Sequence, residues 1–188
     1  MTLSALGIFS AAGAGGGAPL SDYELIETYL LGTTQSSVVF SSLGTYSSTY
    51  KHLQIRVTAR STRADLDSPL GVQFNGITSG YFWHALKGTG SAVQSEALTS
   101  QSSMRLGSPT AANSTANNFG ATVVDILDAY STTKNKTFRS LTGATNLDRI
   151  QLMSGSVAST NSVTSITVLD QFGSFVSGSR FSIYGLKG

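Results

Sequence analysis

The chain of 188 residues is long enough to bury one hydrophobic core and short for two domains. Charged residues make up only 12% of the chain, and the +2 net charge comes without any cluster of cations, which argues against a nucleic-acid partner. The lack of cysteine excludes disulfides, thiolate metal sites and cysteine nucleophiles.

The first segment, residues 1–20, is interpreted as an extended N-terminal arm. Four glycines within residues 13–17 disfavour both helix and strand. Leu6, Ile8 and Phe9 precede them and are apolar enough to favour burial, so we expect them to contact a neighbouring subunit or another protein; an undocked terminus is the alternative. No stretch approaches the ~18 apolar residues of a membrane span, and we expect no membrane partner.

Residues 21–188 form a series of short strand candidates separated by Gly, Ser and Asn. Strands are predicted over residues 22–30, 37–43, 50–60, 71–75, 81–87, 103–106, 121–130, 136–143, 149–154, 163–169 and 180–186. Asp125 and Asp128 also permit a helix over 121–130, and the rest of 88–118 is expected to be loop. Turn signals about every ten residues indicate a single all-β domain, a β-sandwich of about eight to ten antiparallel strands.

The strand over 50–60 has one apolar and one polar face. Leu53, Ile55 and Val57 alternate with His52, Gln54, Arg56, Thr58 and Arg60, and Arg63 follows in the chain. Arginine is well suited to ion pairs at interfaces, so Arg56, Arg60 and Arg63 are predicted to contribute to subunit contacts. A solvated strand face is the alternative interpretation.

No arrangement of residues in the chain resembles a catalytic or metal site. The two histidines, His52 and His84, are 32 residues apart and lack the spacing of metal ligands, and there is no GxSxG motif. Asp65 and Asp67, like Asp125 and Asp128, are more typical of turns than of acid–base pairs. We therefore expect no enzymatic activity, no metal and no cofactor; an enzyme acting on glycans remains the weakest hypothesis.

The segment YFWHALKG, residues 81–88, concentrates aromatic side chains. Alternation places Phe82 and His84 on one face and Tyr81 and Trp83 on the other, and one pair is expected to lie in the core. Aromatic rings stack on sugars and anchor interfaces, so Tyr81 and Trp83 are the candidates for contact with a glycan.

Three stretches resemble a family of structural proteins from the virions of tailed bacteriophages. They are TYKHLQIRVTARSTRA (residues 49–64), GATVVDILDAYSTTKNKTFRSLTG (120–143) and GSRFSIYGLKG (178–188). The resemblance covers residues 22–188, is weakest over 88–118, and implies a β-sandwich of the jelly-roll kind. It provides no catalytic residues to transfer.

The resemblance implies a homotrimeric capsid decoration (cement) protein that stabilises the phage head. The expected partners are other copies of the chain and the major capsid protein, the expected location is the outer surface of the capsid, and the arm with Leu6, Ile8 and Phe9 would be the tether. The alternative is a distal module of a tail fibre or tailspike that binds a host surface glycan through Tyr81 and Trp83. Coiled coil and repeats, which give a fibre its length, are absent, and this favours the decoration protein.

Overall fold

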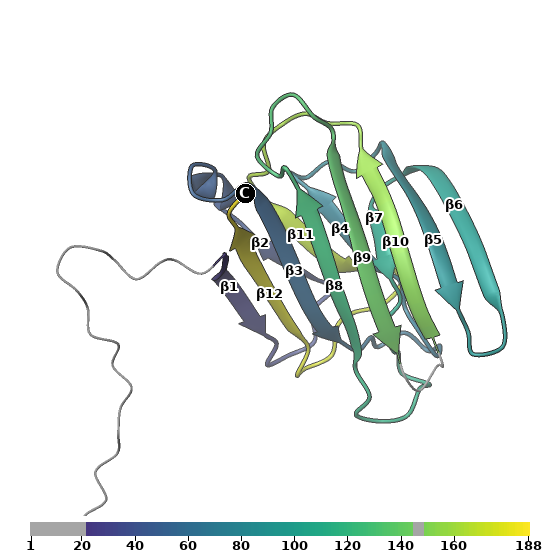
Figure 1. Ribbon diagram of the computed structural model, residues 1–188. Helices are drawn as coiled ribbons and strands as arrows, with labels where there is room; N and C mark the ends of the chain where they lie inside the picture. Colours follow the sequence, from purple (N-terminus) through teal and green to yellow (C-terminus); the bar gives the residue numbers. More distant parts are fainter. Residues whose placement is uncertain (1–21, 145–148) are drawn as a thin grey trace, which may run out of the picture.

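The computed structural model describes residues 22–144 and 149–188, which form two antiparallel β-sheets packed face to face (Figure 1). A short 3-10 helix, η1 (Leu43–Tyr46), interrupts the series of strands. The strands are β1 (Tyr23–Leu30), β2 (Ser37–Phe40), β3 (His52–Ala59), β4 (Leu70–Phe74), β5 (Tyr81–Gly88), β6 (Val93–Gln101), β7 (Met104–Gly107), β8 (Gly120–Leu127), β9 (Lys136–Ala144), β10 (Arg149–Val157), β11 (Ile166–Asp170) and β12 (Arg180–Leu186). The predicted all-β sandwich is thus confirmed.

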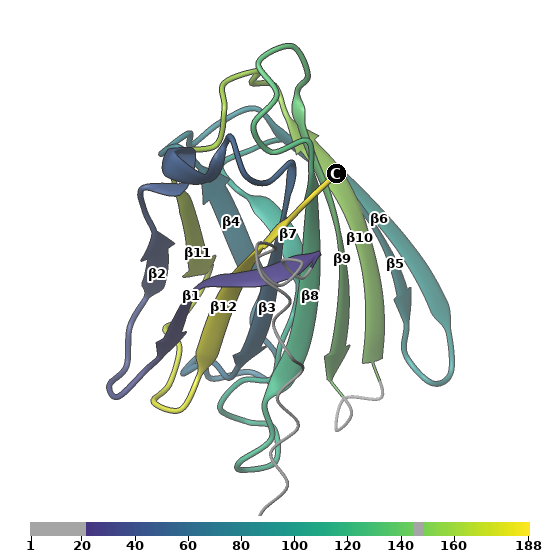
Figure 2. The same cartoon turned by 60° about the vertical axis from the view of Figure 1, so that its left-hand side comes forward.

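The strand order is that of a jelly roll with four added strands. The larger sheet has the order β1-β12-β3-β8-β9-β10-β5-β6, and the smaller sheet has the order β2-β11-β4-β7. When β5, β6, β9 and β10 are set aside, the other eight strands, numbered along the chain, form sheets of order 1-8-3-6 and 2-7-4-5. This is the double Greek key of the jelly roll, and Figure 2 shows its two layers.

The four added strands widen only the larger sheet. The hairpin β9–β10 continues the sheet from β8, and the hairpin β5–β6 forms its far edge (Figure 1). Among the described strands, β6 pairs with β5 alone, and both of its faces are largely exposed. The end of the larger sheet therefore extends past the smaller sheet that covers the rest.

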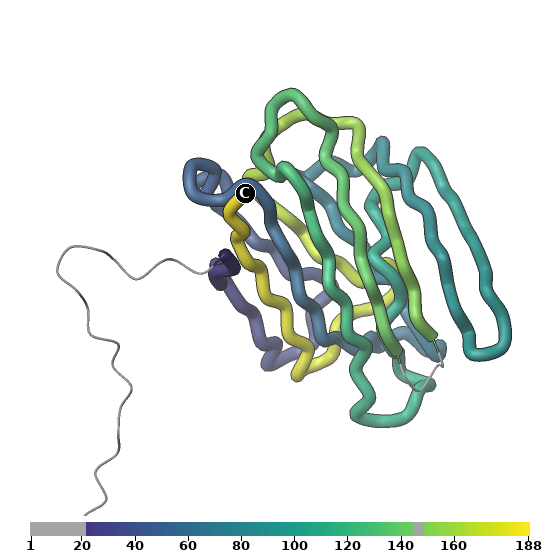
Figure 3. The backbone as a smooth tube through the Cα atoms, viewed as in Figure 1, coloured from purple at the N-terminus to yellow at the C-terminus, as the bar shows by residue number. Residues whose placement is uncertain are grey.

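The hydrophobic core lies between the two sheets, whose backbones run as two facing layers in Figure 3. In β3 the predicted alternation is confirmed, because Leu53, Ile55, Val57 and Ala59 are buried. In β1 a bulge between Leu25 and Glu27 breaks the alternation. As a result Tyr29 packs inward against the ring of Phe40, 5.4 Å away between centroids.

Three local predictions have different outcomes. Residues 121–127 lie in a strand, because their β-branched side chains alternate between a buried and an exposed face, and residues 128–130 form a turn, so the helix alternative is wrong. The turn signal at Asn75-Gly76 is confirmed: both residues have positive φ, 50° and 71°, and the amide of Ile77 donates to Phe74 O. The loop expected over residues 88–118 instead contains β6, which has no buried face to produce an apolar alternation.

Candidate protein-contact surface

The side of the larger sheet that faces away from the smaller sheet, here called the outer face, carries a row of exposed apolar side chains. Cross-strand pairing aligns Val123 of β8 with Leu141 of β9, Leu141 with Leu152 of β10, and Leu152 with Leu86 of β5. All four are exposed, Leu152 by 52%. These four residues are called the apolar row, and they lie side by side on four adjacent strands.

Exposed hydrophobic residues are concentrated on this face. Of the fifteen exposed large hydrophobic side chains among the described residues, eleven belong to it by strand register: Tyr23, Leu25, Leu30, Phe82, Leu86, Val93, Val123, Leu127, Leu141, Ile150 and Leu152. The other four are Val39, Leu66, Leu98 and Phe172. Scattered apolar residues are normal on a surface, but a contiguous group of them marks a binding surface.

The size of the outer face fits a protein partner. Eight strands at about 4.8 Å spacing and seven residue steps of about 3.3 Å give a face of roughly 34 Å by 23 Å, or about 800 Å². A typical stable protein–protein interface buries about 800 Å² on each partner.

A chain of polar side chains crosses the same face beside the apolar row. Arg56 Nε donates to Gln54 Oε1 (2.9 Å), Gln54 Nε2 donates to Asp125 Oδ1 (2.8 Å), and Arg139 Nε donates to Asp125 Oδ2 (3.0 Å). The Arg56 guanidinium also lies over the ring of Tyr184, 4.5 Å from its centroid. The polar chain fixes these side chains in place and gives the face charges of both signs.

A shallow hollow of about 410 Å³ lies where the apolar row meets this polar chain. Its lining combines apolar side chains from three strands with the Asp125–Arg139 ion pair: Val123, Asp125, Arg139, Ser140, Leu141, Leu152 and Met153. The hollow is large enough for a bulky apolar side chain of a partner, which would leave the ion pair at its rim.

The three arginines predicted at subunit contacts have different environments. Arg56 lies on the outer face, as described above. Arg60 is used within the chain: its guanidinium donates to the carbonyl oxygens of Ala112, Ser114, Thr115 and Asn118 at 2.8–3.2 Å. It thereby holds the loop between β7 and β8, a role that alternation in one strand does not indicate. Whether Arg56 and Arg60 contribute to subunit contacts stays a prediction.

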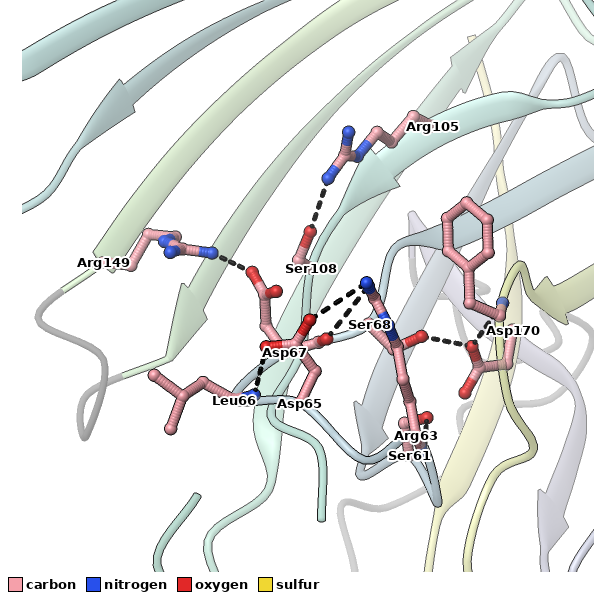
Figure 4. A network of polar contacts seen from close by, with 11 residues as sticks. Ser61, Arg63, Asp65, Leu66, Asp67, Ser68, Arg105, Ser108, Arg149 and Asp170 are labelled. Carbon is pink, nitrogen blue, oxygen red and sulfur yellow. Dashed lines mark hydrogen bonds and ion pairs between the residues drawn. The ribbon is translucent and has the colours of Figure 1, made fainter. Parts of the chain in front are cut away.

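Arg63 belongs to a polar network in the loops at one end of the sandwich, which Figure 4 shows from close by. Its Nη2 lies 2.9 Å from Asp65 Oδ2, and its Nη1 donates to Asp67 O (3.3 Å). Asp67 also forms an ion pair with Arg149 at the start of β10. These contacts join loop to sheet, and the contact of Arg63 with another subunit also stays a prediction.

The prediction that Tyr81 and Trp83 contact a glycan does not agree with the structure. Both rings point into the core, with 0% and 3% exposure, and Tyr81 Oη donates to Ile77 O (3.0 Å). The alternation itself is right, but the pair on the outer face is Phe82 and His84. With aromatic residues on both faces of β5, the sequence pattern gave no means of telling which face is buried.

Charged side chains of β5, β6 and β7 lie on the inner side of the larger sheet near Trp83. The Arg105 guanidinium from β7 lies 5.7 Å from the Trp83 ring centroid. Glu96 of β6 pairs with Lys87 of β5, and this hydrogen bond lowers the pKa of Glu96, while burial lowers the pKa of Arg105. Glu96 is the one charged residue of β6, and the ion pair with Lys87 neutralises its charge.

Leu6, Ile8 and Phe9, predicted to form contacts through the arm, lie outside the described residues. Across residues 22–144 and 149–188, no three His, Asp or Glu side chains gather in a way that could hold a metal ion. Within the same ranges, no helix is long and apolar enough to cross a membrane.

Comparisons with known proteins find no protein-family model, no curated protein and no solved structure that matches this chain.

Proposed function

We propose that this protein is a structural subunit of a bacteriophage particle, a capsid decoration protein that acts as a homotrimer on the head. The observation that carries the proposal is the outer face, which has the size of a protein interface, carries eleven exposed large apolar side chains and is covered by nothing among the described residues. A subunit that is covered by its neighbours in a shell requires a surface of this kind.

Three further observations support this function. The jelly-roll order is frequent in virus capsid proteins, although it also occurs in lectins and other proteins and does not decide function alone. Three stretches of the sequence resemble virion proteins of tailed phages. The low content of charged residues, 12%, also suits a subunit whose surfaces become buried in an assembly.

The competing function is a receptor-binding module of a tail fibre, with a host glycan as ligand. Its two proposed contact residues, Tyr81 and Trp83, are buried, so this function would need another site. Phe82, which is 38% exposed, is the aromatic residue on the opposite face of the same strand.

Counting and locating the protein in purified virions tests the proposal. Quantitative mass spectrometry against the major capsid protein, combined with immunogold labelling, is expected to give many copies per particle on the head. A handful of copies at the tail tip would favour the receptor-binding module. Absence from the particle would overturn both virion functions.

A further inference from the structure

The apolar row has the dimensions of a binding site for a single extended segment. Its four residues span three strand spacings, about 14 Å between the outermost strands. Ile150, which is 56% exposed, lies two positions before Leu152 in β10, on the same outer face, and widens the row. The row alone is too small for a stable contact between two folded domains, but it is long enough for about five residues of extended chain.

The sequence holds a segment that fits this surface. Residues 3–9 contain four large apolar side chains, Leu3, Leu6, Ile8 and Phe9, in seven positions. Fully extended, six residue steps cover about 20 Å, which matches the row with its flanking side chains. We propose that residues 3–9 of a neighbouring copy bind across the apolar row. This inference rests on the proposed function in one respect, namely that copies of the chain associate.

The hollow beside the row provides the specific part of the contact. It adjoins Leu141 and Leu152 and has room for one bulky apolar side chain, such as that of Phe9 or Ile8. Burying such a side chain stabilises a complex far more than contact with a flat surface does, because the side chain loses water on all sides.

The polar chain indicates that the segment comes from a neighbouring copy. The arm joins the sheet at β1, which lies at the edge of the sheet opposite the apolar row. To reach its own row, which begins at Val123 of β8, the arm would cross β12 and β3 and cover Arg56 with residues 11–18, AAGAGGGA. These residues have no charged side chain that could replace the water lost around the Arg56 guanidinium, so covering it is costly.

A neighbouring copy can approach from the other edge of the sheet, where β5 and β6 place Leu86 and Val93 first in its path. The thirteen residues 10–22 between Phe9 and β1 can span at most about 43–47 Å. This reach is enough to link two adjacent subunits whose larger sheets are about 34 Å wide.

The absence of cysteine allows a direct test by disulfide formation. An affinity-tagged Ile8→Cys variant is mixed with an untagged Leu152→Cys variant and oxidised under mild conditions. The expected product is a mixed disulfide dimer, identified by its mass. Val39→Cys serves as the matched control in place of Leu152→Cys, because Val39 is an exposed apolar residue (47%) on the smaller sheet, and it is expected to give no mixed dimer.

The double variant Ile8→Cys/Leu152→Cys separates the two possible sources of the segment. Disulfide-linked oligomers support binding by a neighbour, whereas a disulfide within a single chain would overturn it. Equal cross-linking of Leu152→Cys and Val39→Cys, or none with either, would also overturn the inference. In that case, association in sedimentation experiments and many copies on the head would leave the proposed function intact; a protein that is monomeric and absent from virions would end both.

A double-mutant cycle provides a readout that does not depend on cysteine chemistry. Deletion of residues 2–10 and the pair Leu141→Lys/Leu152→Lys are each expected to weaken self-association at least tenfold. If the segment binds the row, the combined variant loses no more than either change alone. Losses that multiply would show two independent contacts and would overturn the inference.

Discussion

The two faces of the larger sheet are formed by the same strands, but they differ in what covers their apolar side chains. On the inner face, Ile55, Val124 and Phe138 are buried beneath the smaller sheet, and their burial accounts for the fold. On the outer face, Val123 and Leu141 alternate with these same residues, but nothing among the described residues covers them. Burial on the inner face thus explains the stability of the fold, and the outer face is the surface proposed to bind a partner.

The largest difference between the faces should appear on truncation of a side chain. Trp83→Ala removes a buried ring from the inner face and is expected to lower the free energy of unfolding by about 3–5 kcal/mol. Leu152→Ala on the outer face should change it by less than about 0.5 kcal/mol at concentrations where the chain is monomeric. Urea unfolding at low protein concentration measures both, and equal losses would contradict the assignment of the faces.

Glycine positions provide a second pair of probes. A Cβ at Gly155 in β10 would lie 2.2 Å from Phe82 O and 2.7 Å from Met104 Sδ, so Gly155→Ala should lower the free energy of unfolding by about 1–3 kcal/mol. At Gly143 in β9 a Cβ would meet nothing within 4 Å, and Gly143→Ala should be nearly neutral. A neutral Gly155→Ala, measured by thermal and urea unfolding, would show that β7 does not pack closely on β10.

Charged substitutions on the outer face test its role in association. Leu141→Lys/Leu152→Lys is expected to weaken self-association by about 3 kcal/mol, or roughly a hundredfold in dissociation constant, because two leucines lose their buried contacts. Sedimentation velocity over a range of concentrations measures the effect. The control Val39→Lys/Leu66→Lys changes two exposed apolar residues outside this face and should leave association unchanged. If the control weakened self-association as much, the outer face would not be the surface through which copies of the chain associate.

The smallest effect is confined to alkaline pH. Tyr50 Oη donates to Glu24 Oε2, and this hydrogen bond raises the pKa of Tyr50 to about 12; burial likewise raises the pKa of Tyr130 to about 12. A folded-state pKa above the usual value of about 10 stabilises the fold fully below pH 10, and this contribution is lost as the pH rises towards 12.

The variant Tyr50→Phe should therefore show a shallower loss of stability between pH 10 and 12 than the unchanged chain. Phenylalanine is chosen because it keeps the ring, against which Gly185 packs directly. Thermal unfolding at several pH values measures the slope. An unchanged slope in Tyr50→Phe would mean that the hydrogen bond to Glu24 does not form in solution.

Strong two-residue alternation made much of the fold predictable. Residues 50–60 and 180–186 each show a polar–apolar pattern, and the structure has strands at His52–Ala59 and Arg180–Leu186. Strand β6 was missed because Gln94, Ser95 and neighbouring residues contact no core and so carry no apolar period. Each of the eleven predicted strand ranges overlaps a strand, so the described residues form twelve with β6, more than the eight to ten expected for the sandwich.

The candidate surface was less predictable because it depends on contacts between distant parts of the chain. Leu86 and Leu152 are neighbours only through the pairing of β5 with β10, although they are 66 residues apart in the chain. In β5 both faces carry aromatic residues, so pattern alone could not show that Trp83 is buried and Phe82 exposed. From the sequence, Arg60 was interpreted as a surface cation. In the structure its partners are carbonyl groups more than fifty residues away in the chain.

A cryo-electron microscopy reconstruction of the phage particle proposed to contain this protein tests the central claim most directly. We predict that the outer face, with the apolar row of Leu86, Val123, Leu141 and Leu152, is covered by another protein chain and that the exposed side of the smaller sheet is less covered. A reconstruction in which the outer face is open to solvent, with all contacts made by the smaller sheet or the loops, would contradict the proposal that this face is the contact surface.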